Sequence, residues 1–75
     1  IEVIAIESEV LATIAENVRR LRAERGWSQE ALAERAHIDR SYLAGIETGR
    51  RNPSVSKLVQ VANALSVRLK ELLES

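Results

Sequence analysis

The feature that most constrains the fold is the spacing of apolar residues between Ser28 and Gly49. Along this stretch, apolar side chains recur mostly at intervals of three and four residues. They are Leu32, Ala33, Ala36, Ile38, Leu43 and Ile46. Intervals of this kind place side chains on one face of an α-helix. Because the pattern is interrupted at residues 37–39, the sequence predicts two short helices joined by a tight turn.

Residues 28–49 therefore fit a helix-turn-helix of the kind that binds DNA. Two helices that cross near a right angle need a small residue where their backbones approach, and Ala33 meets that need. Ile38 is expected to fill the corner from within the turn. The second helix, from about Arg40 to Thr48, would be the recognition helix.

The expected recognition helix has a start signal, a stop signal and two different faces. Asp39 is a suitable N-cap, and Gly49 can end the helix in the left-handed conformation. The buried face is expected to carry Leu43, Ile46 and Glu47. The outer face is polar at its N-terminus and small in its middle, which suits a major groove about 12 Å wide.

Three further helices are expected around this pair, which makes the chain all-α. From about Ser8, apolar residues follow one helical face up to a stop at Gly26, although Thr13 and Glu16 also form a capping box that would start the helix there. Ser28 and Ser54 are expected to cap the helices that follow them, and a short last helix covers residues 69–73. Residues 1–7 fit a short strand, a disordered arm or the start of a helix, and these alternatives stay open.

A chain of 75 residues forms one small domain, and its apolar residues are mostly aliphatic, with no Phe. The absence of Cys excludes disulfides and thiolate metal sites, and it fits a reducing cytoplasm. The longest apolar runs, such as residues 3–6, are too short for a membrane span or a signal peptide. Because the chain opens on Ile1 rather than Met, native residues can precede it.

The formal net charge is zero, but the charges are unevenly distributed. Residues 1–18 carry four acidic residues and no basic residue. The first basic group follows and consists of Arg19, Arg20, Arg22 and Arg25. The second basic group consists of Arg40, Arg50, Arg51 and Lys57. A molecule with one basic face can bind phosphate despite zero net charge. The alternative is that these are solvated surface charges.

The segment GWSQEALAERAHIDRSYLAGIETGRRNPS resembles the Cro/phage-repressor type of helix-turn-helix domain. Its DRSYLAGIE part is especially similar to the controller proteins of restriction-modification systems, and the resemblance covers roughly Ile14 to Leu73. It implies a compact five-helix, lambda-repressor-like fold. The chain departs from the family pattern at His37, where Gly is usual, and at Ser66 and Arg68, where a Gly and then a Ser cap usually precede the last helix.

The resemblance also implies which residues would contact DNA. Those expected at base edges are Arg40, Ser41, Tyr42, Ala44 and Gly45, with Gly45 leaving room for close approach. Those expected at phosphates are Ser28, Gln29, Arg50, Arg51, Asn52, Ser54 and Lys57. Tyr42 could equally be a half-buried packing residue. Arg22 and Glu47 would form a buried ion pair that joins the first helix to the recognition helix, the alternative being two unrelated surface charges.

These observations predict a homodimeric transcriptional regulator that binds double-stranded DNA on a palindromic operator in the bacterial or phage-infected cytoplasm. The dimer interface is expected within residues 54–75, with contacts through Val55, Val59, Leu69 and Leu72. The chain shows no catalytic residue set, and a single His cannot form a metal site, so neither an enzyme, a metal nor a cofactor is expected. Two alternatives remain, an antitoxin that also binds a toxin and a protein-interaction module that has lost DNA binding. Arg40, Ser41 and the loop at residues 50–52 argue against the second.

Overall fold

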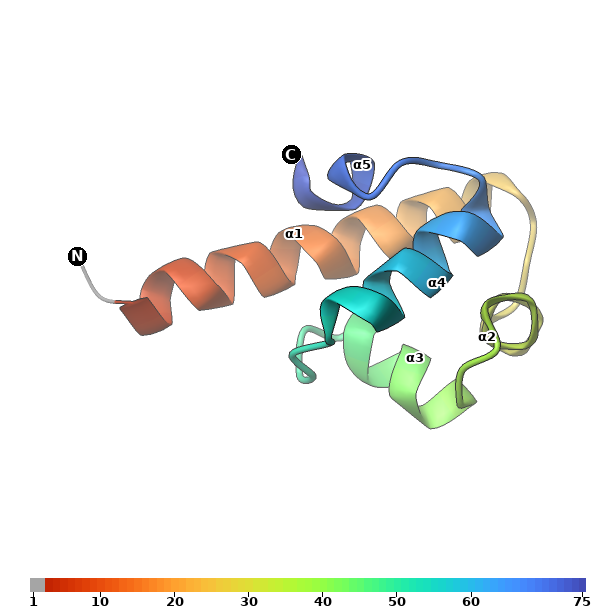
Figure 1. Ribbon diagram of the computed structural model, residues 1–75, viewed down its shortest axis with the longest axis horizontal. Coiled ribbons are helices and arrows are strands. Elements are labelled where there is room, and N and C mark those ends of the chain that lie inside the picture. The colour runs from red at the N-terminus through yellow and green to blue at the C-terminus, as the bar shows by residue number, and fades with distance from the viewer. Residues whose placement is uncertain (1–2) are drawn as a thin grey trace.

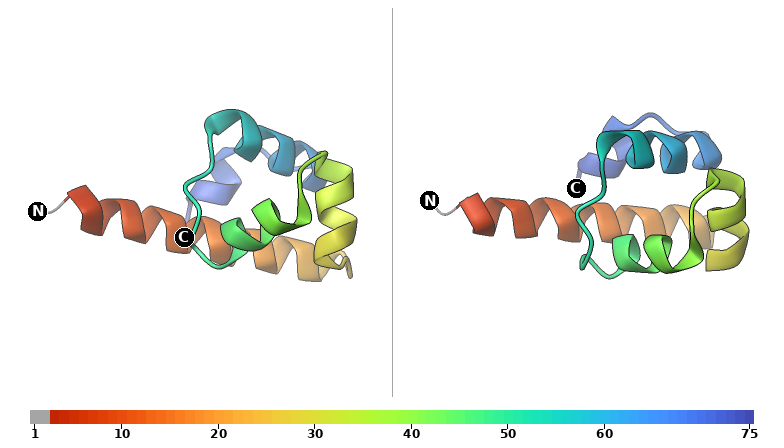
Figure 2. Two further views of the ribbon diagram at one scale, coloured as in Figure 1. Left: turned by 90° about the horizontal axis from the view of Figure 1, so that it is seen from below. Right: turned by 60° about the horizontal axis from the view of Figure 1, so that its bottom comes forward.

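The computed structural model describes residues 3–75, with side chains from residue 6 onward. This part of the chain contains five α-helices and no strand, so the expected all-α architecture is confirmed. The helices are α1 (Val3–Glu24), α2 (Gln29–Ala36), α3 (Arg40–Glu47), α4 (Val55–Leu65) and α5 (Lys70–Leu73). The long helix α1 runs along the longest axis of the molecule (Figure 1). It contacts α3 and α5, while α2 contacts α3 and α4 (Figure 2).

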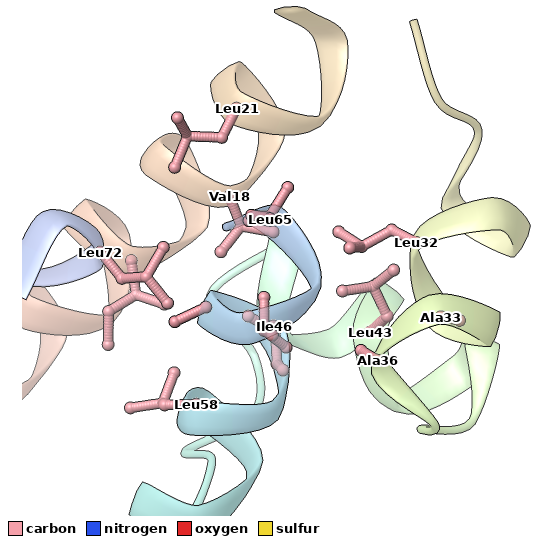
Figure 3. Packing of buried hydrophobic residues seen from close by; sticks show 13 residues of the cluster. Val18, Leu21, Leu32, Ala33, Ala36, Leu43, Ile46, Leu58, Leu65 and Leu72 are labelled. Atoms are coloured by element: carbon pink, nitrogen blue, oxygen red, sulfur yellow. The ribbon is translucent and has the colours of Figure 1, made fainter. Parts of the chain in front are cut away.

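The core lies where the apolar faces of all five helices meet. Its most deeply buried apolar side chains are Val18, Leu32, Leu43, Ile46, Val61, Leu65 and Leu72. Leu43 and Ile46 of α3 point toward Leu32 of α2 and Leu65 of α4 (Figure 3). These residues fall at the intervals that the sequence predicts, and Ala33 is buried at the approach of α2 to its neighbours.

The first helix begins earlier than expected. Neither Ser8 nor Thr13 starts it, because both lie inside α1, which runs from Val3. Of the alternatives left open for residues 1–7, the start of a helix is the one that residues 3–7 adopt, and residues 1–2 lie outside the described residues. The sequence from residue 3 to Thr13 contains no Gly or Pro, so nothing in it breaks the helix before the capping-box residues.

The first four helices all end in the same way. At each end a residue with positive φ follows the helix, namely Gly26, His37, Gly49 and Ser66. The next backbone N–H then donates to a carbonyl five residues earlier, as Ile38 does to Ala33 O at 3.0 Å and Val67 to Ala62 O at 3.0 Å. This is the Schellman motif. His37 and Ser66 therefore occupy left-handed positions where the resembling family usually has Gly, and the turn geometry is preserved.

In three of these four motifs, the residue after the left-handed position is apolar and packs against the core. These residues are Trp27, Ile38 and Val67. The packing role expected for Trp27 and the corner-filling role expected for Ile38 are therefore confirmed. In the fourth motif, after α3, that residue is Arg50, which stays exposed. The C-terminal end of α3 is thus the only one of these four helix ends after which the left-handed residue is followed by an exposed basic residue.

The start signals are partly as expected. The Ser28 hydroxyl oxygen accepts a hydrogen bond from the Ala31 N–H at 3.1 Å, and the Ser54 oxygen accepts one from the Lys57 N–H at 3.2 Å. Asp39 occupies the N-cap position of α3 in an extended conformation, but its side chain accepts no capping hydrogen bond. The capping role expected for its carboxylate is therefore wrong, although the helix begins at Arg40 as predicted.

A buried polar residue holds the C-terminal helix in place. Asn17 lies on the apolar face of α1, and its side-chain amide donates to Leu72 O at 2.9 Å and to Glu74 O at 2.7 Å. Its carbonyl oxygen accepts a hydrogen bond from Arg20 at 3.3 Å. Sequence reasoning missed this residue, although a single Asn between Ile14 and Val18 on an apolar stripe is the kind of signal that marks a satisfied buried amide.

Candidate DNA-binding surface

The recognition helix α3 has one side fixed in the core and one end free. Leu43, Ile46 and Glu47 are buried, as predicted, so the rotation of the helix about its axis is fixed. Arg40 and Ser41 are exposed at its N-terminus. The first turn of α3 therefore presents a cation and a hydroxyl to solvent on a rigid support.

A shared carboxylate sets the position of this helix. Glu47 is 2% exposed, and its carboxylate accepts hydrogen bonds from Arg22 Nε at 2.7 Å and Arg22 Nη2 at 3.0 Å. It also accepts one from Gln29 Nε2 at 3.0 Å. The ion pair proposed from the sequence is present, and Gln29 at the start of α2 also braces the recognition helix, as expected. Arg19 completes the arrangement by donating to the Glu47 carbonyl.

The Glu47 contacts also act on Arg22. The hydrogen bond to Glu47 raises the pKa of Arg22, burial opposes this, and the coulombic attraction of Glu47 adds to the rise. Arg22 Nη1 further donates to Trp27 O at 2.8 Å, so its guanidinium joins α1, the following loop and α3. A buried carboxylate is tolerated when it is paired and hydrogen-bonded in this way.

The loop after the recognition helix folds back onto it. The backbone N–H groups of Arg50 and Arg51 both donate to Gly45 O, at 3.0 and 3.2 Å. The Arg51 guanidinium lies 4.5 Å above the centre of the Tyr42 ring. A Cβ at Gly45 would lie only 3.1 Å from Arg51 Cβ. Arg51 is therefore packed along the surface of α3 instead of extending from a free loop.

Gly45 has a packing role in this structure. Its missing side chain makes room for Arg51. Tyr42 is half-buried, packs against the core and carries Arg51 on its ring, so both of its expected roles are compatible with its position. Ala44 is half-buried in the middle of the helix.

The residues expected at phosphates surround α3. Ser28 and Ser54 stand at the starts of α2 and α4, and backbone N–H groups at helix starts attract anions. Lys57 lies in the first turn of α4, and Arg50 and Asn52 are exposed in the loop. The side-chain amide of Asn52 donates to Glu7 Oε2 at 2.6 Å, which brings the first turns of α1 next to this loop.

The two basic groups differ in their contacts within the protomer. All four arginines of the first basic group bind acceptors within the protomer. Arg19 and Arg22 bind Glu47, Arg20 pairs with Glu24 at 3.2 Å, and Arg25 donates to the carbonyls of Leu21 and Leu65. The arginines of the first basic group are therefore engaged within the protomer. The second basic group belongs to α3, the loop after it and the start of α4.

The residues expected at the dimer interface differ in how exposed they are. Val55 and Val59 are 67% and 38% exposed on α4, and Leu69 is half-buried. Leu72 is 0% exposed inside the protomer core, so its side chain cannot contribute to an interface. The periodicity of the last segment did not distinguish its inward from its outward leucines, and Leu73, which is 44% exposed, is the accessible one.

No cluster of three or more metal-ligating side chains and no small-molecule pocket occurs within the described residues. Among the helices of the described part, none is both long enough and apolar enough to cross a membrane. What the described residues do offer is a buried scaffold that displays α3 between two serine-capped helix starts (Figure 2).

The fold and this surface define a helix-turn-helix domain. Residues 18–72 match the helix-turn-helix family HTH_3, and the chain belongs to that family. It is 39% identical over 67 residues to the Neisseria hypothetical transcription factor of Neisseria meningitidis, covering 89% of this chain and 63% of that protein. It is 46% identical over 57 residues to the immunity repressor protein of Bacillus phage phi105, covering 76% of this chain but 40% of the repressor.

Solved structures give the same result. The restriction-modification controller protein C.AhdI from Aeromonas hydrophila superimposes with a TM-score of 0.80 at 40% identity, covering 83% of this chain and 94% of that one. The Neisseria transcription factor superimposes with a TM-score of 0.85 at 38% identity, covering 91% and 78%. The relatives are thus a transcription factor, a repressor and a controller protein, and the resemblance to the Cro/phage-repressor type is confirmed.

Proposed function

We propose that this chain is a sequence-specific transcriptional regulator that binds duplex DNA as a homodimer, with α3 in the major groove. The observation that carries the proposal is the first turn of α3, where Arg40 and Ser41 are exposed while the opposite side of the helix is held in the core. An arginine can take guanine O6 and N7 together, which is the commonest specific base contact.

In this proposal the surface divides into reading and positioning residues. Arg40 and Ser41 read base edges, with Tyr42 and Ala44 beside them on α3. Ser28, Gln29, Ser54 and Lys57 bind phosphates from the starts of α2 and α4. Arg50, Arg51 and Asn52 bind the backbone beside α3. Contacts to phosphates set the register of a protein on DNA, and contacts to bases give selectivity.

The homodimer follows from how few bases one recognition helix reaches. A two-fold dimer doubles the site and makes the operator pseudo-palindromic, with half-sites about 34 Å apart or a multiple of that. Val55 and Val59 support an interface at the start of α4, because they are exposed apolar side chains on an otherwise well-packed domain.

The similarity to C.AhdI favours a controller role in a restriction-modification system as the finer function. The similarity to the Neisseria transcription factor and to the phage repressor supports the broader class, a transcriptional regulator. None of these three relatives is named as an antitoxin, and no observation favours that alternative. The proposed place of action is the bacterial cytoplasm, at the nucleoid.

The decisive experiment is a selection of bound sites from random duplex DNA. We expect enrichment of two inverted half-sites with a fixed spacing, and tight binding of the selected site but not of a scrambled duplex of equal length. A folded protein that enriches no sequence, or that enriches a single unpaired half-site, would contradict the proposal.

A further inference from the structure

The first turns of α1 carry an exposed apolar stripe. We call residues 3–12 the α1 extension, because they precede Ile14, where fully buried core residues begin. Ile6 and Val10 are each 43% exposed. They precede Thr13 and Asn17 at intervals of three and four residues, so all four share one flank of the helix. At Asn17 this flank is covered by α5, and at Ile6 and Val10 it is open.

The other large exposed apolar side chains belong to α4 and α5. For residues 6–75, the large hydrophobic residues that are exposed are Ile6, Val10, Val55, Val59 and Leu73. The start of α4 and α5 lie near the middle of the long axis, beside the part of α1 that directly follows the α1 extension (Figures 1 and 2). The Asn52–Glu7 hydrogen bond ties the α1 extension to the loop that leads into α4.

We propose that the α1 extension is a dimerisation arm, and that Ile6 and Val10 pack against a second copy of this chain together with Val55, Val59 and Leu73. This inference rests on the proposed homodimeric function and specifies its interface. The α1 extension lies outside residues 18–72, the part of the chain that matches the family model.

The area that a stable dimer needs supports this occupant. A stable interface buries roughly 800 Å² per partner, which is a large share of the 4827 Å² surface of this small protein. Val55, Val59 and Leu73 alone give three partly exposed side chains, which is too small an apolar centre for such an interface. The α1 extension adds two more apolar side chains and about three turns of helix surface.

The spacing on DNA also favours arms that overlap. The long dimension of the protomer is 37 Å, and α3 lies in the half away from the N-terminal end (Figure 1). Two copies in line that met only at the tips of their arms would hold their recognition helices more than 37 Å apart. One turn of DNA is about 34 Å, so half-sites at that spacing would require the arms to lie alongside the partner.

The composition of the α1 extension fits the same role. Its residues include Val3, Ile4, Ile6 and Val10, which are β-branched and form helices less readily than unbranched residues. Helical stability in proteins comes mostly from packing an amphipathic face. The second copy would provide the packing surface that Ile6 and Val10, exposed within the protomer, lack.

The test compares two double variants by analytical ultracentrifugation across a range of concentrations. Ile6→Ser/Val10→Ser removes the apolar stripe, and Ser8→Ala/Ala12→Ser changes two exposed residues on the opposite side of the same turns. We expect the dimer dissociation constant to rise at least tenfold in the first variant and to stay within about twofold in the second. Circular dichroism checks that both keep their helical content. If the first loses it, the single variant Val10→Ser replaces it.

The outcomes separate this inference from the proposed function. If the wild-type protein is a monomer at all concentrations and binds its selected site as a monomer, the homodimeric function itself fails. If the wild type dimerises and Ile6→Ser/Val10→Ser or Val10→Ser dimerises equally well, the function stands and the dimerisation arm is refuted. An equal loss in both double variants also refutes it, because the effect would then not depend on the apolar stripe.

Discussion

Glu47 is the residue through which the recognition helix is positioned. Its buried carboxylate binds Arg22 of α1 and Gln29 of α2, so three helices meet at one charged group. Because the pKa of Arg22 is raised by this contact, the stability it contributes is complete below the ordinary arginine pKa. It is lost only as the pH rises through the raised value. The cation of this pair therefore persists through the neutral range.

Replacing Arg22 should be far more damaging than replacing a neighbouring surface arginine. Arg22→Ala leaves the Glu47 carboxylate buried with Gln29 alone, and breaking such a pair costs about 3–5 kcal/mol of unfolding free energy. Arg20→Ala removes an exposed pair with Glu24 and should cost about 1 kcal/mol or less. Urea unfolding followed by Trp27 fluorescence measures both. Similar losses in the two variants would mean that the Glu47 pair does not hold the fold.

Removing both partners gives a second check on the same pair. Arg22→Met/Glu47→Leu leaves no uncompensated charge, so this double variant should be more stable than Arg22→Ala alone. The same unfolding experiment compares them. A double variant less stable than the single one would show that the charges contribute net stability beyond their mutual compensation.

Arg40 should carry selectivity, because it starts α3 and its side chain is exposed there. Arg40→Ala is expected to weaken binding to the selected site by about 1–3 kcal/mol and to change binding to scrambled DNA little. Arg50, exposed just beyond the left-handed turn at Gly49, is the matched control, and Arg50→Ala should weaken both duplexes about equally. The measurement is a titration of each variant against both duplexes. If Arg40→Ala also weakened both equally, Arg40 would be a phosphate contact, and Ser41 or Tyr42 would have to read the site.

At the scale of elements, the shared left-handed turn sets the path of the chain between helices. Four turns of one kind redirect the backbone after α1, α2, α3 and α4. Three of them pack the next residue against the core, and the turn at Gly49 instead leads into the exposed Arg50 and then Arg51, which lies over Tyr42. The same turn thus packs an apolar residue against the core at three places and leads into an exposed arginine at the fourth.

Replacing Gly26 and Ser66, both in left-handed positions, by alanine should lower stability by different amounts. Gly26 has a φ of 69°, and a Cβ there would meet nothing within 4 Å, so Gly26→Ala is penalised only by its backbone. We expect a loss of about 1 kcal/mol. Ser66 adopts a φ of 58° and already bears a Cβ, so Ser66→Ala should change stability by roughly half of that or less. Thermal unfolding by circular dichroism compares the two, and equal losses would argue against backbone strain as the cause.

The parts of this architecture that the sequence predicts are those encoded locally. Apolar spacing within α2, α3 and α4, and the serines at positions 28 and 54, identify helices and caps from neighbouring residues alone. The roles of Arg25 and Arg51 could not be found that way, because Arg25 binds the carbonyl of Leu65, 40 residues away, and Arg51 depends on a fold-back onto Gly45. The start of α1 was missed because a capping box also occurs inside helices, where the preceding residues continue the helix.

At the scale of the whole molecule, the net charge is zero, but the two basic groups make different contacts. The first basic group is used within the protomer, and the second surrounds α3. An arginine that already binds a carbonyl or carboxylate has fewer donors left for phosphate. The number of phosphate contacts should therefore follow the second group alone, and not the total count of basic residues.

This division predicts the salt dependence of DNA binding. With Arg50, Arg51 and Lys57 on phosphates in each protomer, a dimer makes about six such contacts, so affinity should fall about 10³-fold between 50 and 200 mM salt. Lys57→Ala should lower the slope of log affinity against log salt by about one per protomer. Arg20→Ala should leave that slope unchanged, because Arg20 pairs with Glu24 and Asn17. Titrations of the three proteins on the selected duplex at several salt concentrations give the slopes. Equal slopes for wild type and Lys57→Ala would mean that Lys57 does not bind phosphate. A lowered slope for Arg20→Ala would mean that the first basic group also binds phosphate.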